Sequence, residues 1–179
     1  EMERLARLMR ERRGGFAAIW GRRRIGKSEL LKEWCRRFAG LYTVADQSLP
    51  SVQRSSFALA LSEHFKGFAD VTYPSWKVLF EALSRRAAEE DWHGPLVMDE
   101  FPYWVEADAS LPSVMQNWVD GEKSRHGIVC AIAGCDESRG SGPDSLSAAV
   151  ILADLTDVRR NRVANGKDAA HFTEEDRIC

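Results

Sequence analysis

Several features that define whole classes of protein are absent from this sequence. Its apolar runs are too short to span a bilayer, and no stretch combines a basic start, an apolar centre and a small-residue cleavage site. The first absence argues against a membrane protein, and the second argues against a secreted one. We therefore expect a cytoplasmic protein with no membrane partner.

Cysteine is scarce, and none of the four copies stands in a C-x-x-C pair. The four histidines are scattered along the chain rather than clustered. Closely spaced thiolate and imidazole groups are what a zinc site or a redox motif requires, so we expect neither here. The pattern instead favours reduced thiols, two of them filling the core. The cysteines are Cys35, Cys130, Cys135 and Cys179.

Neither sign of charge is in large excess. The 179 residues are 44% hydrophobic and 29% charged, with a net charge of −2, which is ordinary for one globular domain. Residues 1–40 nevertheless hold 12 of the 25 Lys and Arg but 5 of the 27 Asp and Glu, a local charge of about +7 against about −9 for the rest. The acidic remainder argues against a general nucleic-acid binder, so nucleic acid would be a partner only through domains outside this chain.

Short apolar runs alternate with amphipathic segments before Gly134. Strands are expected where the runs lie between glycines or turn residues, and helices where apolar residues recur every three or four positions. This alternation favours a parallel sheet covered by helices on both faces, a three-layer α/β domain. The predicted strands are 16–20, 41–46, 95–101 and 127–134, and the predicted helices are 1–13, 27–39, 51–68, 75–90 and 110–126.

The composition changes after Gly134. Residues 135–179 contain one aromatic residue, Phe172, and are largely polar and aperiodic. Residues 145–155 fit either a helix or a strand. We expect 1–134 to form the folded core and 135–179 to be a poorly ordered tail.

One loop carries the phosphate-loop pattern G-x-x-x-x-G-K-S, with a strand before it and a helix after it. Its glycines let backbone N–H groups turn toward phosphate oxygens, and the helix adds its positive dipole end. Lys27 can reach the β- and γ-phosphates, and the Ser28 hydroxyl can bind Mg²⁺. A solvated basic turn is the alternative. The predicted nucleotide-binding residues are Gly21, Arg22, Arg23, Arg24, Ile25, Gly26, Lys27, Ser28 and Glu29.

The second motif is LVMDE, an apolar strand that ends in Asp99 and Glu100. Parallel strands deliver their carboxyl ends to one ligand crevice, so this pair is expected beside the loop. Asp99 would hold Mg²⁺ directly or through water, and Glu100 would polarise the attacking water as a general base. The alternative is that the pair only caps a strand.

The arginines Arg22, Arg23 and Arg24 allow three interpretations. One could face a phosphate, one could act in trans as an arginine finger on a second copy or a partner domain, or all could be solvated loop charges. Solvation is the simplest of the three.

The sequence resembles the archaeal-type ATPases, a branch of the signal-transduction ATPases related to the AAA class. The resemblance rests on GRRRIGKS at 21–28, GGF before the first strand and DEFPYW at the acidic strand, and it runs from about Glu1 to Gly134. It implies a P-loop ATPase fold with strand order 5-1-4-3-2 and a sensor strand, here residues 128–134, between the two motif strands. The family's fifth strand, helical lid and winged helix are not evident after Gly134, so the chain is expected to be truncated or frame-shifted there.

The function expected from these residues is Mg²⁺-dependent ATP binding and hydrolysis, with Lys27 and Glu100 catalytic and Ser28 and Asp99 on the metal. A nucleotide-binding switch that does not hydrolyse and an inactive remnant remain as alternatives. A phosphotransferase would not need the water-activating Glu100, and the acidic remainder disfavours a nucleic-acid module.

Overall fold

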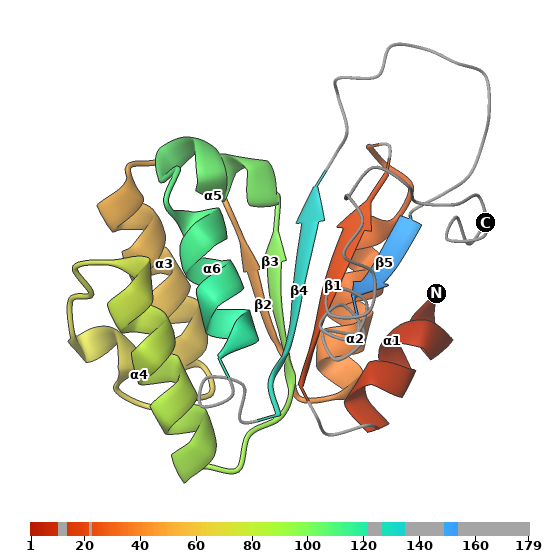
Figure 1. The fold of residues 1–179 in the computed structure, drawn as a ribbon, viewed down its shortest axis with the longest axis horizontal. Coiled ribbons are helices and arrows are strands. Elements are labelled where there is room, and N and C mark those ends of the chain that lie inside the picture. The colour runs from red at the N-terminus through yellow and green to blue at the C-terminus, as the bar shows by residue number, and fades with distance from the viewer. Residues whose placement is uncertain (11–13, 22, 122–126, 135–148, 154–179) are drawn as a thin grey trace, which may run out of the picture.

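A computed structural model describes residues 1–10, 14–21, 23–121, 127–134 and 149–153 of the chain (Figure 1). Strands and helices alternate through most of this length, as the sequence predicts. The elements are α1 (Met2–Arg10), β1 (Gly15–Trp20), α2 (Lys27–Arg37), β2 (Leu41–Val44), α3 (Pro50–Ser62), the short 3-10 helix η1 (Phe68–Asp70), α4 (Trp76–Glu89), β3 (Pro95–Asp99), α5 (Phe101–Ala107), α6 (Leu111–Asp120), β4 (Val129–Gly134) and β5 (Ala149–Ala153).

The strands form one sheet in the order β2-β3-β4-β1-β5. The first four are mutually parallel, which confirms the α/β prediction, and the order is the one that the resemblance implies, read from the opposite edge. β5 runs antiparallel to β1, pairing Phe16 with Ala153 and Trp20 with Ala149, so the prediction of a parallel sheet is wrong at this edge. An antiparallel edge strand needs no right-handed crossover helix, so the alternation of elements could not predict its direction.

Helices cover both faces of the sheet, an arrangement compatible with the predicted three-layer fold (Figure 1). Every residue of β3 and of β4 is buried, because side chains on both faces of these central strands are covered. Along β3, Val97 packs with α1 and α2, whereas Leu96 and Met98 pack on the opposite face with the helices α3 to α6. Because each of these strands contributes side chains to a buried cluster on either face of the sheet, its sequence is an unbroken apolar run.

Several predicted boundaries are wrong. The third strand ends at Asp99 rather than at Phe101, and helix α5 follows at once. Pro102 is tolerated there because the first turn of a helix leaves its N–H groups unbonded. The helix predicted over 51–68 ends at Ser62, and Gly67, with a φ of 79°, immediately precedes η1. The helix predicted over 110–126 ends at Asp120; residues 122–126 lie outside the described part of the chain.

Within residues 135–179 the structure describes only Ala149–Ala153, the strand β5. The remainder of the segment, and the prediction that it is poorly ordered, lie outside the described residues. The boundary after Gly134 therefore stays a prediction. In the described part of the chain, no helix has the length and apolar character needed to cross a bilayer.

Candidate functional site

The glycine-rich loop joins β1 to α2 at the carboxyl edge of the sheet, in the strand–loop–helix context that the pattern requires. Gly26 immediately precedes α2 and has a φ of 91°, in the left-handed region that favours glycine. A Cβ built on Gly26 would meet no atom within 4 Å. The loop therefore leaves open space at the N-terminus of an eleven-residue helix, where the helix dipole favours an anion.

Lys27 is the first residue of α2 and only 8% exposed. Its Nζ donates a hydrogen bond to the carbonyl oxygen of Gly21 at 2.9 Å, so its side chain spans the loop from end to beginning. A buried ammonium group is costly unless hydrogen-bonding and charged partners compensate it. The Lys27 amine therefore lies beside Gly21, at the start of the loop.

The other predicted loop residues are distributed around this centre. Arg22 lies outside the described residues, whereas Arg23, Arg24 and Ile25 are exposed, and Arg24 has a φ of 65°. Glu29 accepts a hydrogen bond from Lys32 at 3.4 Å on the exposed side of α2. The exposure of Arg23 and Arg24 is compatible with each of the three interpretations, so all three stay predictions.

Asp99 and Ser28 meet although 71 residues separate them in the sequence. The Ser28 Oγ donates to Asp99 Oδ2 at 2.7 Å, and Asp99 is only 2% exposed. β3 delivers the carboxylate and the first turn of α2 delivers the hydroxyl, because both elements end or begin at the same sheet edge. The two residues predicted to hold a metal therefore lie side by side.

Tyr42 completes this cluster, and the sequence analysis missed it. Its hydroxyl donates to the same Asp99 Oδ2 at 2.5 Å. Burial raises the pKa of Tyr42 above its ordinary value, and the hydrogen bond and negative charge of Asp99 raise it further. No sequence pattern indicated this contact, because it depends on the strand register: Tyr42 lies two residues before Val44, which pairs with Asp99 across β2 and β3.

The backbone after β3 is held by a second set of hydrogen bonds. Asp99 Oδ1 accepts from the Glu100 N–H at 2.8 Å, and the Asp99 carbonyl accepts from Trp104 Nε1 at 3.0 Å and from the Ala45 N–H at 3.1 Å. Glu100 itself is partly exposed, with a φ of 52° and a ψ of 43°. A left-handed conformation in a residue other than glycine is uncommon and costs energy, and such residues cluster at functional sites. The turn places the Glu100 N–H on Asp99 Oδ1, while Ser28 donates to the other oxygen of the same carboxylate.

No protein-family model matches this chain, and no curated protein matches its sequence. The resemblance to archaeal-type ATPases therefore stays a prediction.

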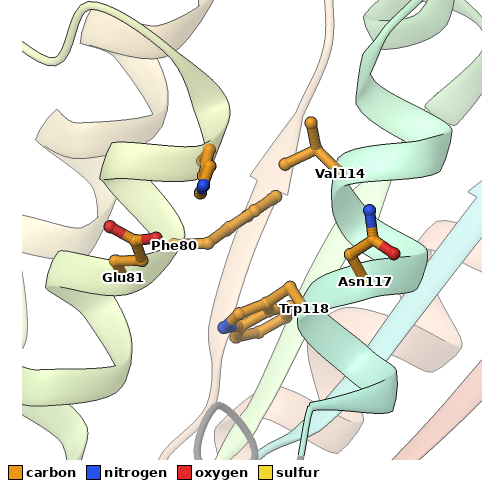
Figure 2. A pocket seen from close by; sticks show the side chains of 6 residues that line it. Phe80, Glu81, Val114, Asn117 and Trp118 are labelled. Atoms are coloured by element: carbon orange, nitrogen blue, oxygen red, sulfur yellow. The ribbon is translucent and has the colours of Figure 1, made fainter.

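The described residues also line cavities away from the loop. A cavity of about 370 Å³ lies between α4 and α6, where the rings of Phe80 and Trp118 stack with centroids 4.7 Å apart (Figure 2). A second, of about 290 Å³, lies along the outside of α3. Neither cavity includes a residue of the loop or of the acidic pair. The first is lined by Lys77, Phe80, Glu81, Val114, Asn117 and Trp118.

The donor atoms that Ser28 and Asp99 bring together are both oxygens. Among the described residues, no group of three or more His, Cys, Asp and Glu side chains could hold a metal ion. Ser28 and Asp99 offer two hard oxygen ligands, and Mg²⁺ commonly takes its remaining ligands from phosphate and water. The open space at Gly26 lies at the start of the same helix that carries Ser28.

Proposed function

We propose that this chain is an ATPase domain that binds ATP with Mg²⁺ at residues 21–28 and hydrolyses it, as part of a switch or motor protein. The observation that carries the proposal is the 2.7 Å contact of Ser28 with Asp99, which joins the phosphate-loop pattern to the acidic strand. A basic turn without a ligand would not require a buried carboxylate on the neighbouring element. ATP and Mg²⁺ are the proposed cofactors.

Each residue would act through the atoms it already presents. The backbone N–H groups around Gly26 would bind phosphate oxygens, and Lys27 Nζ would leave the Gly21 carbonyl to bind the β- and γ-phosphates. Ser28 and Asp99 would hold Mg²⁺, which when bound neutralises charge on the phosphates. This positioning and charge stabilisation account for most of the catalysis expected of such a site.

Glu100 is the proposed general base. It follows Asp99 directly and is partly exposed, so its carboxylate can take a proton from a water molecule while Asp99 remains buried. The Trp104 and Ala45 hydrogen bonds to the Asp99 carbonyl fix the turn from which Glu100 projects.

The first experiment is a thermal unfolding series with and without Mg·ATP. At about 100 times the dissociation constant, the ligand should add roughly 2.7 kcal/mol to the free energy of unfolding of the wild type. Lys27→Ala should lose this gain. Lys66→Ala is the matched control, because it removes an exposed lysine from the region after α3 and should keep the gain. A cooperative wild-type transition that ignores Mg·ATP would overturn the proposal.

Glu100→Gln then separates hydrolysis from binding. The variant keeps the size and shape of the side chain, but its amide cannot accept a proton from the attacking water. The hydrolysis rate should therefore fall by about 10²–10⁴-fold, while the stabilisation by Mg·ATP stays intact. A wild type that binds Mg·ATP without releasing phosphate would instead favour the non-hydrolysing switch.

A further inference from the structure

We propose that Tyr42 is a positioning residue of the metal site, which holds Asp99 Oδ2 in place for Mg²⁺. The inference rests on the proposed function and adds to it a residue from β2, outside both sequence motifs. Its basis is that two hydroxyl groups from different elements converge on a single carboxylate oxygen.

The two hydroxyls have different fates when a metal binds. Ser28 is itself a proposed metal ligand, so the partners of its oxygen change on binding. Tyr42 donates to Asp99 Oδ2 at 2.5 Å from the flanking strand and is not in the ligand set. Of these two donors, Tyr42 is therefore the one that can hold Oδ2 in the same orientation before and after the metal arrives.

The rest of the tyrosine is held independently of the ligand. Its backbone lies in β2, paired with Val97 of β3. Lys32 Nζ, on α2, lies 5.5 Å from the centroid of its ring. Its hydroxyl is thus aimed by packing and strand pairing, and a donor fixed in this way loses little freedom when it orients a carboxylate.

The hydrogen bond to the other carboxylate oxygen of Asp99 supports the same interpretation. Asp99 Oδ1 accepts from the Glu100 N–H at 2.8 Å, a bond to the adjacent residue within the same turn. Tyr42 adds a restraint from a different strand. With both bonds in place the buried carboxylate can present a free lone pair in only a narrow range of directions.

Tyr42→Phe is the direct test, because it removes one oxygen and keeps the ring. ATP binding is measured by thermal shift at fixed ATP, first in EDTA and then over a titration of MgCl₂. The apparent dissociation constant for Mg²⁺ should rise about tenfold, the scale expected for losing one hydrogen bond to a charged group, while the shift in EDTA should not change.

Two further proteins make the result specific. Tyr73→Phe is the matched control, since it also removes a tyrosine hydroxyl, one that donates to the Phe68 carbonyl at 2.9 Å, and it should leave the Mg²⁺ titration unchanged. In an Asp99→Asn background, Tyr42→Phe should have no further effect on the Mg²⁺ dependence. A structural role in packing alone would lower the unliganded melting temperature but would not move the Mg²⁺ midpoint.

The outcomes separate this inference from the proposed function. A wild type that responds to ATP and Mg²⁺ while Tyr42→Phe titrates identically overturns the role of Tyr42 alone. A variant that binds Mg²⁺ more tightly also overturns it, since the hydroxyl would then compete with the metal. A wild type that ignores ATP in both buffers overturns the proposed function and this inference together. If Tyr42→Phe fails to fold, Lys32→Ala, which removes the cation above the ring, should raise the Mg²⁺ midpoint in the same direction, and an unchanged midpoint overturns the inference.

Discussion

The Ser28 hydroxyl donates a hydrogen bond to the buried Asp99 carboxylate at 2.7 Å. This contact ties the first turn of α2 to the end of β3, and Tyr42 joins it from β2. The stability of the empty protein and its response to Mg²⁺ therefore depend on the same carboxylate.

Asp99→Asn should affect both properties. The amide can place an oxygen toward only one of the two sides that now accept hydrogen bonds, so its NH₂ group must face either the Glu100 N–H or the two hydroxyls. We expect the free energy of unfolding to fall by about 1–3 kcal/mol and the Mg²⁺-dependent part of ATP binding to vanish. Urea unfolding and the Mg²⁺ titration measure the two effects. The exposed Asp70→Asn serves as the control, and equal behaviour of the two variants would contradict the prediction.

Gly26→Ala tests the backbone conformation of the loop without introducing a steric clash. The added methyl group meets no atom within 4 Å, so the loss of stability comes from the φ of 91° alone and should be about 1–2 kcal/mol. The Mg·ATP gain should also be lost, because the N–H groups of the loop must turn away. Gly67 has a φ of 79° and lies far from the loop, so Gly67→Ala should lose stability but keep the stabilisation by Mg·ATP. Retention of the gain in Gly26→Ala would argue against phosphate binding there.

Gly134→Ala should destabilise the end of β4 through a steric clash. A Cβ at this position would lie 2.5 Å from Trp20 Cζ3, closer than real Cβ contacts allow, and 3.0 Å from Pro102 Cδ, a tight contact. We expect a loss of about 1–3 kcal/mol in the free energy of unfolding. Adding Trp20→Leu should recover part of that loss, giving a favourable coupling energy in a double-mutant cycle. Additive effects of the two changes would show that the Trp20 ring does not rest on Gly134.

Alkaline pH should destabilise the protein through two buried thiols. Burial raises the pKa of Cys35 and of Cys130 from an ordinary value of 9.0 to about 12. A folded-state pKa above the unfolded value means that the unfolded state loses its proton first as the pH rises. The contribution of each protonated thiol to the free energy of unfolding is therefore complete below pH 9 and is lost between about pH 9 and 12. Each thiol should contribute a slope of up to about 1.4 kcal/mol per pH unit. Urea unfolding at pH 7.5 and pH 10 measures it, and Cys130→Ala should show a shallower decline. A slope unchanged by that substitution would contradict the assignment.

The sequence predicted the parts of the fold that local patterns encode. The apolar runs around Ile19, Val97 and Ile132 correctly identify the parallel strands, since a strand covered on both faces has no polar alternation. Ser75 correctly indicates the start of α4, where its side chain accepts from the Val78 N–H. The errors lie at boundaries: α5 was missed because Pro102 reads as a break, although the first helical turn accepts it.

The candidate site divides in the same way. Lys27, Ser28 and Asp99 could be named in advance because the phosphate-loop spacing and an apolar strand ending in acids are local patterns. Tyr42 could not, because its contact with Asp99 depends on β2 lying next to β3 and on side-chain parity across the two strands.

By itself, the sequence predicted which residues would carry phosphate-binding and metal-binding chemistry, and it determined which segments form the parallel strands. Only the tertiary structure decided that Ser28, Tyr42 and Asp99 share one carboxylate oxygen, that β5 runs antiparallel beside β1, and that Trp20 rests on Gly134. The physical reason is the distance along the sequence over which each effect acts. Periodicity and turn chemistry act over a few neighbouring residues, whereas strand order and close packing depend on the whole chain burying its apolar surface at once.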